Sequence, residues 1–178
     1  MNKKLTRIIS SAMFAAFICV ATMLIRIPSP MNGYVNLGDC FILASAWILG
    51  PVYGFAAAGV GSALADLISG YPVYIPGTFV IKGLMAVAAA LITRKLMSSF
   101  PKKKLISFIA GGFAAELIMV GGYLLYESAI YGFVPSLSGI PGNVLQGVCG
   151  LVAGTALIRS LSAAGVTRKM KAYTEAAA

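Results

Sequence analysis

Long apolar runs separated by short polar or basic segments are the feature that most constrains how this chain can fold. Residues 8–25, 52–68 and 105–126 form runs with at most one charged side chain each. An α-helix needs about 20 mostly apolar residues to cross a bilayer. Only 11% of all residues are charged, whereas soluble domains contain about 25%. The chain is therefore predicted to be an integral membrane protein.

The apolar runs predict an all-α fold with six transmembrane helices in one compact bundle, formed by a single domain over residues 1–178. Pro28, Pro30 and Gly33 end the first helix and predict an extended connection after it. Gly50 and Pro51 separate the second helix from the third. The second is short for a span and could instead be a re-entrant or packed segment. The predicted helices cover approximately residues 6–27, 38–50, 52–69, 78–97, 105–127 and 140–160.

The first helix could instead be a signal peptide, because Lys3, Lys4 and Arg7 precede its apolar run. That run is longer than the roughly 7 to 15 apolar residues of a signal peptide, and Arg26–Pro30 is a poor cleavage site. We expect the helix to be retained.

Basic residues predict which side of the membrane each end of the bundle faces. They cluster before the first helix, between the fourth and fifth, and after the sixth. Placing both termini in the cytoplasm puts all of these clusters inside and leaves Arg26 as the exception, which agrees with the positive-inside rule. The net charge of +9 does not indicate a nucleic-acid partner, because the charges do not follow one face.

Polar side chains within the predicted helices gather in the outer half of the membrane. Lys82 lies about 8 Å into the fourth helix from outside, counted at 1.5 Å per residue, and Asp66 lies in the last turn of the third. Glu116, Tyr123 and Glu127 share one face of the fifth helix. Charged groups in a bilayer are costly unless they face protein or water, so Lys82 and Glu116 should point into the bundle. They either contact a ligand or form a structural ion pair with each other.

Other polar residues at the same depth have two readings each. Asn143 and Gln146 share a face of the sixth helix and either contact a ligand or form hydrogen bonds between helices. Tyr71 and Tyr74 lie in a proline-rich outer loop and either stack on a ring or belong to the interfacial aromatic belt.

Small residues at spacing four predict close helix contacts. They form a candidate partner-docking surface, although packing within the bundle is an equal alternative. The surface would consist of Ala12, Ala16, Ala57, Gly61 and Ala65.

Several enzyme signatures are absent from the sequence. It contains no phosphate-binding loop of the Walker type, no histidine, and no serine or cysteine with a recognisable base partner. Cys19, Cys40 and Cys149 lack metal-ligand spacing and are interpreted as packing residues. We therefore expect neither an enzyme nor a metal site, and a polar pocket without its own energy source suggests a substrate-capturing subunit.

Four segments resemble the substrate-binding S components of energy-coupling factor (ECF) transporters, the vitamin importers of bacteria and archaea. They are Ala12-x-x-x-Ala16, Tyr34–Asp39, Leu49–Gly54 and Ile81–Leu84. The resemblance covers about residues 5 to 160. It implies a multi-pass protein of a bacterial cell membrane that binds a vitamin from outside. It also implies docking through helices one to three onto a transmembrane coupling (T) subunit, with two cytoplasmic ATPases that supply energy.

The resemblance also implies a ligand site near the outer surface, walled by helices four to six and covered by the loop Met31–Asp39 and the loop before helix four. Lys82 and Asn143 would donate hydrogen bonds to the ligand, Glu116 would accept one, and tyrosines would stack on a flat ring. No cofactor is expected, since the vitamin is the transported substrate. The candidate substrate-binding residues are Asn36, Asp39, Tyr71, Tyr74, Lys82, Glu116, Tyr123, Asn143 and Gln146.

Vitamin B6 or hydroxymethylpyrimidine, the pyrimidine precursor of thiamine, suits this residue set best. The Asn36–Asp39 and Tyr71–Pro76 segments look most similar to the pyridoxine and hydroxymethylpyrimidine S components. Pantothenate suits a tyrosine-rich pocket less well. A self-sufficient carrier or channel, or a membrane assembly or regulatory protein, are the alternatives to an S component.

Overall fold

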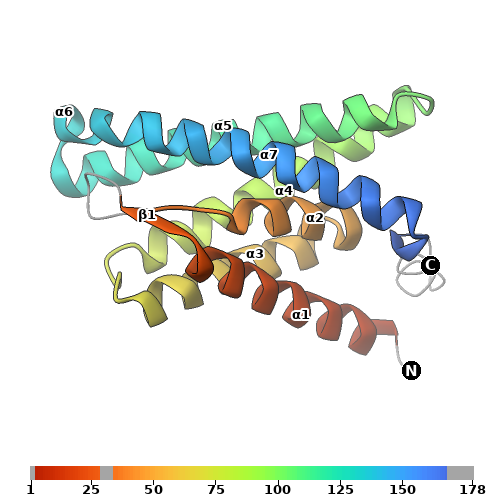
Figure 1. Cartoon of the computed structure of the whole chain (residues 1–178), viewed down its shortest axis with the longest axis horizontal. Coiled ribbons are helices and arrows are strands. Elements are labelled where there is room, and N and C mark those ends of the chain that lie inside the picture. The colour runs from red at the N-terminus through yellow and green to blue at the C-terminus, as the bar shows by residue number, and fades with distance from the viewer. Residues whose placement is uncertain (1–2, 29–33, 168–178) are drawn as a thin grey trace.

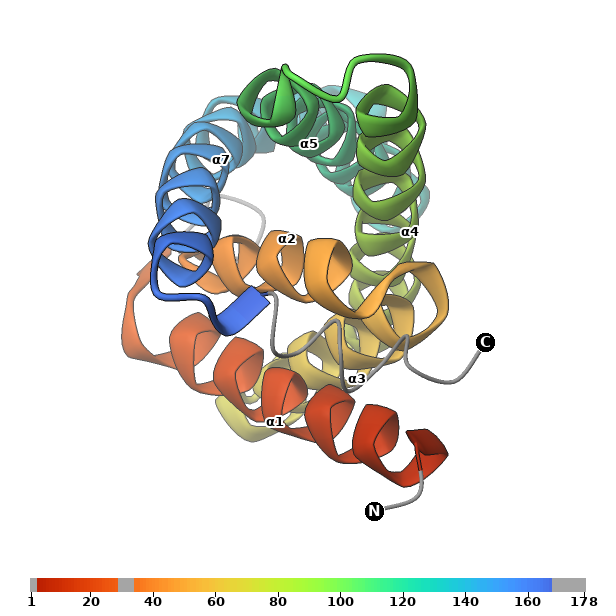
Figure 2. The same ribbon diagram turned by 90° about the vertical axis from the view of Figure 1, so that its right-hand side faces the viewer.

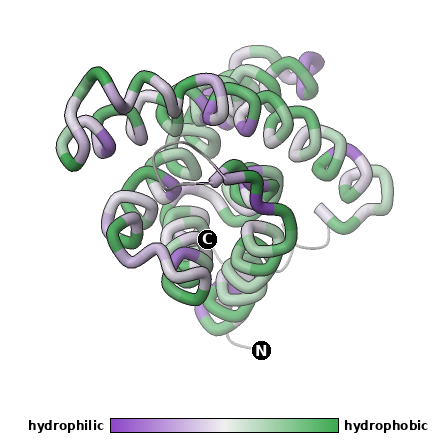
Figure 3. Tube along the Cα trace, turned by 60° about the vertical axis from the view of Figure 1, so that its left-hand side comes forward, coloured by the Kyte–Doolittle hydropathy of each residue, from purple (hydrophilic) through white to green (hydrophobic). Residues whose placement is uncertain are grey.

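The computed structural model describes residues 3–28 and 34–167, which are mostly helical (Figure 1). Figure 3 shows that apolar residues cover most of the length of the helices. The elements in chain order are α1 (Lys3–Leu24), β1 (Arg26–Pro28), β2 (Tyr34–Asn36), α2 (Gly38–Leu49), α3 (Pro51–Ser69), α4 (Ile75–Ser99), α5 (Lys104–Tyr131), α6 (Phe133–Ser136), the 3-10 helix η1 (Leu137–Gly139) and α7 (Ile140–Ala163).

Five helical stretches in the described ranges are long and apolar enough to cross a membrane: α1, α3, α4, α5, and the run from α6 through α7. Helix α2 has 12 residues and is too short to cross alone, since a span needs about 20. Large apolar side chains are exposed around the bundle, as expected where lipid replaces water. Examples are Met13, Phe17, Val52, Leu91, Phe113, Leu117, Val148 and Val152.

Helix α2 lies inside the bundle and packs against α1, α3, α4 and α7 (Figure 2). Nine of its residues are buried, so it is apolar on nearly all sides, as expected of a core helix. Its short length follows from this position, because it is surrounded by protein rather than by lipid.

The two ends of the bundle differ in composition. The β1–β2 hairpin, the α3–α4 turn and α6 lie at one end, called here the hairpin end, and the start of α1, the α4–α5 turn and the end of α7 lie at the other (Figure 1). We call the second the basic end, because it carries Lys4, Arg7, Arg94, Lys95, Lys102, Lys103, Lys104 and Arg159.

Several helix boundaries differ from the predicted ones by three or four residues, and two of these differences have identifiable reasons. Helix α1 ends at Leu24 rather than at 27, because Arg26–Pro28 pairs with Tyr34–Asn36 as an antiparallel hairpin. Helix α4 begins at Ile75 rather than at 78. Pro76 lies in its first turn, where backbone N–H groups have no partner within the helix, so the missing N–H of proline costs nothing. The fixed φ of proline also suits the helix. Of the predicted covering loop Met31–Asp39, residues 31–33 lie outside the described residues.

The predicted docking residues separate into two groups. Ala12 and Ala16 are exposed on α1, whereas the three small residues of α3 are buried inside the bundle. A Cβ added to Gly61 would lie 2.5 Å from the Ala15 carbonyl oxygen of α1, so the two backbones touch there. The face of α3 with Ala57, Gly61 and Ala65 therefore serves internal packing and is not an exposed docking surface.

Candidate functional site

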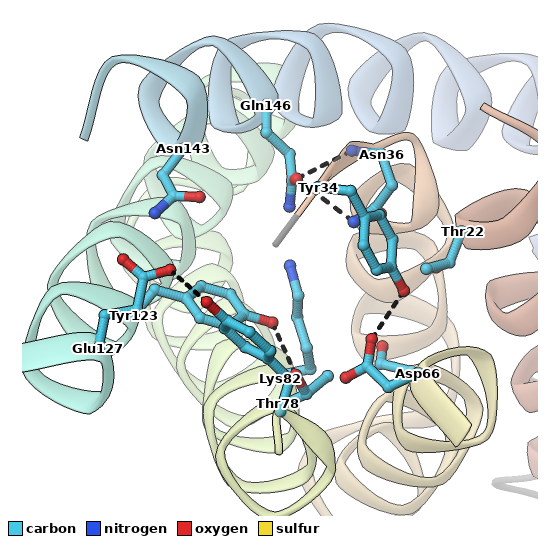
Figure 4. A pocket seen from close by; sticks show the side chains of 12 residues that line it. Thr22, Tyr34, Asn36, Asp66, Thr78, Lys82, Tyr123, Glu127, Asn143 and Gln146 are labelled. Carbon is cyan, nitrogen blue, oxygen red and sulfur yellow. Dashed lines mark hydrogen bonds between the residues drawn. The ribbon is translucent and has the colours of Figure 1, made fainter. Parts of the chain in front are cut away.

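A pocket lies at the hairpin end of the bundle and encloses about 470 Å³, counted out to its opening (Figure 4). Every side chain that lines it carries a polar group, although 59% of the chain is hydrophobic. The lining comes from α1, β2, α3, α4, α5, α7 and the residue before α4. It consists of Thr22, Tyr34, Asn36, Ser62, Asp66, Tyr74, Thr78, Lys82, Tyr123, Glu127, Asn143 and Gln146.

A hydrogen-bonded network ties four elements together beside the pocket. Lys82 on α4 donates to Asp39 Oδ1 on α2 at 2.5 Å, and Gln146 on α7 donates to Asp39 Oδ2 at 2.7 Å. The Gln146 Oε1 atom accepts from the Asn36 backbone N–H of β2 at 2.9 Å. Asp39 is completely buried and Lys82 is 2% exposed. The first turn of α2 suits the Asp39 carboxylate, because a helix N-terminus favours negative charge.

Lys82 therefore pairs with Asp39 and not with Glu116. The alternative of a Lys82–Glu116 ion pair is wrong, because the buried start of α2 brings a nearer carboxylate to the lysine. Glu116 packs instead against the glycines of α7: a Cβ on Gly147 would lie 3.3 Å from its Oε2, and one on Gly150 would lie 3.1 Å from its Oε1. Neither Glu116 oxygen has a hydrogen-bond partner among residues 3–28 and 34–167.

Two tyrosines each hold a carboxylate of the pocket wall. The Tyr34 hydroxyl donates to Asp66 Oδ1 at 2.7 Å, and the Tyr74 hydroxyl donates to Glu127 Oε1 at 3.2 Å. Burial raises the pKa of both phenols well above 10, and the negative charges of Asp66 and Glu127 raise it further. Both hydroxyls therefore stay protonated as donors at neutral pH.

An aromatic wall adjoins these pairs. The Tyr123 hydroxyl and Thr78 Oγ1 lie 3.1 Å apart, and the Lys82 ammonium lies 5.5 Å from the centre of the Tyr123 ring. The Tyr74 and Tyr123 ring centres are 6.4 Å apart. Aromatic faces of this kind suit a flat ring, and the surrounding carboxylate, amide and hydroxyl groups can form hydrogen bonds with its edge.

Comparison with known proteins identifies the family. Residues 2–163 match the family model described as ECF-type riboflavin transporter, S component. The chain belongs to this S-component family. The resemblance found in the sequence is thereby confirmed, and the S component is a substrate-binding subunit of a transporter rather than an enzyme. Family membership and the apolar helices together indicate a multi-pass membrane protein, and membership implies a vitamin substrate and docking with T and ATPase subunits.

Two relatives extend over most of the chain. An uncharacterized protein in the gap 3′ region of Pyrococcus woesei is 36% identical over 141 residues, which is 79% of this chain and 90% of the relative. The thiamine precursor transporter HmpT of Lactococcus lactis subsp. cremoris is 24% identical over 167 residues, which is 93% of both proteins.

Six of the nine predicted substrate-binding residues of this S component line the pocket: Asn36, Tyr74, Lys82, Tyr123, Asn143 and Gln146. The other three lie outside it. Asp39 is behind Lys82, and Glu116 is against α7. Tyr71 packs on the Tyr34 ring, with the ring centres 4.9 Å apart.

Six lining residues of the S component were not chosen from the sequence: Thr22, Tyr34, Ser62, Asp66, Thr78 and Glu127. A sequence signal exists for the two acids, because both fall at the same depth as the chosen residues. Thr22 and Ser62 lie on apolar helices and give no such signal. Tyr34 lines the pocket from β2, whose position depends on its pairing with β1.

Proposed function

We propose that this S component captures a small heteroaromatic vitamin precursor in the hairpin-end pocket, with the pyrimidine precursor of thiamine as the preferred substrate. The all-polar lining of an otherwise apolar bundle carries this proposal. The similarity to the thiamine precursor transporter of Lactococcus lactis, which extends over 93% of the chain, supports the same substrate class.

Vitamin B6 is an alternative substrate of the same class, since it is a single ring of similar size with similar functional groups. Riboflavin is a second candidate class, because the description of the matching family model names it. Riboflavin has a larger fused-ring system and a long polyol chain, so the lining would have to rearrange more to hold it than to hold a single ring.

The substrate is proposed to enter from outside, with six passes and the basic end in the cytoplasm. The start of α1, the α4–α5 turn and the end of α7 share the basic end, which supports this arrangement under the positive-inside rule. A docked T subunit and two ATPases would then supply the energy for release inside. The exposed Ala12 and Ala16 of α1 remain candidates for contact with the T subunit.

Mass spectrometry of ligand released from the purified protein tests the substrate. The protein would be prepared in mild detergent from cells grown with thiamine precursors, vitamin B6 and riboflavin. Recovery of hydroxymethylpyrimidine is the expected result. Recovery of riboflavin would overturn the preferred substrate and favour the second class.

Asn143→Ala tests the site. Asn143 faces the pocket and makes none of the described hydrogen bonds within the protein, so its loss should weaken ligand binding without unfolding the bundle. Lys82→Ala should also weaken binding, and unchanged affinity in both variants would remove the site assignment. Uptake into liposomes by the chain alone, without ATP or partner subunits, would instead indicate a self-sufficient carrier.

A further inference from the structure

Asp66 and Glu127 each present one buried oxygen without a hydrogen-bond partner to the same pocket. Tyr34 occupies Asp66 Oδ1 and Tyr74 occupies Glu127 Oε1. Asp66 Oδ2 and Glu127 Oε2 have no hydrogen-bond partner among the described residues. The two side chains are 4% and 3% exposed, so water does not solvate them freely. A buried acceptor left unsatisfied is costly and requires an explanation.

Two neighbouring groups lie close to these oxygens. The Thr78 hydroxyl lies beside Asp66 and can donate to it when Tyr123 is the donor in the Thr78–Tyr123 hydrogen bond, so a ligand at Asp66 would share the carboxylate with Thr78. Glu127 Oε2 lies next to Gly139, where an added Cβ would come within 2.8 Å of it, and the Asn143 amide nitrogen lies 3.8 Å from the same point without forming a hydrogen bond to Glu127. Both carboxylates line the pocket, one from α3 and one from α5 (Figure 4).

The described lining also offers no spare cation. Lys82 is the one basic side chain among the described residues that line the pocket, and its ammonium is already paired with Asp39. Within the described ranges, no ion pair involves Asp66 or Glu127. The described lining therefore offers two carboxyl groups as acceptors and no uncommitted positive group.

We propose that Asp66 and Glu127 select the substrate by accepting hydrogen bonds from two separate donor groups on its ring. This inference rests on the proposed function and narrows its substrate class. The favoured ligand carries an amino group and a hydroxymethyl group at different positions and has no anionic substituent. Ligands with a phosphate or carboxylate group are rejected, because the buried lining has no uncommitted cation to pair with an added negative charge. The pyrimidine precursor therefore fits as the free alcohol and not as its phosphate ester.

Calorimetric titration of the detergent-solubilised protein tests this selection. The probes are hydroxymethylpyrimidine, its phosphate ester, and two analogues that lack either the amino or the hydroxymethyl group. The wild-type protein should bind the free alcohol most tightly. Loss of one hydrogen bond to a charged acceptor should weaken binding about 10- to 100-fold, and the phosphate ester should lose at least as much.

Two isosteric variants assign each donor group. Asp66→Asn and Glu127→Gln keep the side-chain shape and should each weaken binding of the full ligand about 10- to 100-fold. Each variant should also bind the full ligand and one of the two analogues with equal affinity, namely the analogue that lacks the donor group bound by the replaced carboxylate. Ser160→Ala is the control, because Ser160 is exposed on α7 and its hydroxyl donates to Ala156 of the same helix. Its affinities should match those of the wild type.

The outcomes separate this inference from the proposed function. Binding of hydroxymethylpyrimidine with unchanged affinity in both variants would overturn the selection and leave the function standing. Equal affinity of the wild type for the free alcohol and its phosphate ester would also overturn the selection. This comparison does not depend on the folding of any variant. If the wild type binds none of the single-ring probes but binds riboflavin, the proposed substrate class fails and the selection fails with it.

Discussion

Two contacts between helices in this protein each depend on a glycine, but for different purposes. In the scaffold seam, between α1 and α3, Gly61 allows the α3 backbone to meet the Ala15 carbonyl. In the polar seam, where α7 meets α2 and α5, Gly150 makes room for side chains instead. A Cβ there would lie 2.7 Å from Asp39 Cβ and 3.1 Å from Glu116 Oε1. Small residues therefore permit backbone contact in one seam and burial of carboxylates in the other.

The energetic consequences differ accordingly. A defect in the scaffold seam changes packing alone, and overpacking costs typically about 1 to 3 kcal/mol. A defect in the polar seam can leave a charge unpaired in an environment without water, which costs more. The polar seam also supports the pocket, because Asp39 holds both Lys82 and Gln146. Changes there should affect stability and ligand binding together.

The largest effect is expected from Lys82→Met. This variant leaves Asp39, which is fully buried, without its cation, and breaking a buried ion pair in this way costs about 3 to 5 kcal/mol. Reversible unfolding in mixed detergent micelles would measure the loss. Adding Asp39→Asn to the same chain should restore part of the stability, since the unpaired charge is then gone. A double variant less stable than Lys82→Met would contradict the pairing.

Gly61→Ala should have the next largest effect, near 3 kcal/mol, because its Cβ would meet backbone atoms that only a shift of a whole helix can move. Gly121→Ala on α5 is the matched control, since nothing lies within 4 Å of the added Cβ. Ligand affinity of the folded Gly61→Ala protein should equal that of the wild type. A loss of affinity with intact stability would show that the scaffold seam is coupled to the pocket.

Gly150→Ala should cost somewhat less, about 2 kcal/mol, because the added Cβ would lie 2.7 Å from Asp39 Cβ, whereas the one at Gly61 would lie 2.5 Å from a backbone oxygen. The α2 backbone fixes the Asp39 Cβ, so α2 or α7 must shift to relieve the contact. The distinguishing effect of Gly150→Ala should be on the ligand: displacement of Asp39 moves Lys82 and Gln146, so affinity should fall as well. Thermal unfolding and calorimetric binding of the same preparation measure both quantities. Unchanged ligand affinity would show that the polar seam, like the scaffold seam, contributes to stability alone.

The sequence allowed the helices and the small-residue contacts to be predicted, but not which small-residue face is buried. Long apolar runs predict the helices well, and Gly61 follows from small-residue spacing. The same spacing did not distinguish α3, whose small face is buried, from α1, whose Ala12 and Ala16 are exposed. Spacing along one helix reports which residues share a face, but it does not report which helix covers that face.

The pocket was predictable in its depth and less so in its pairings. Lys82 and Gln146 were chosen because polar groups within a membrane must face protein or water, and both line the pocket. The partner of Lys82 depended on α2 lying inside the bundle, which its short apolar run suggests only weakly. The position of Tyr34 depended on strands of three residues each, too short to be distinguished from an extended loop in the sequence.

The smallest expected effect concerns Tyr34, which joins the hairpin to Asp66 outside both seams. The hydrogen bond is partly exposed, so Tyr34→Phe should lower the free energy of unfolding by only about 0.5 to 1 kcal/mol at neutral pH. Burial and the charge of Asp66 raise the pKa of the folded phenol above 10, whereas an unfolded tyrosine ionises near 10. Below pH 10 the phenol is neutral in both states, and the contribution is complete.

Above pH 10 the unfolded chain loses the Tyr34 proton while the folded chain keeps it, so wild-type stability should fall relative to Tyr34→Phe as the pH rises. Unfolding of both proteins across this range, with phenolate absorbance recorded in parallel, measures the difference. Tyr53→Phe at the basic end is the control for loss of one tyrosine. A wild-type advantage over Tyr34→Phe that stays constant or increases above pH 10 would show that the folded phenol does not keep its proton beside Asp66.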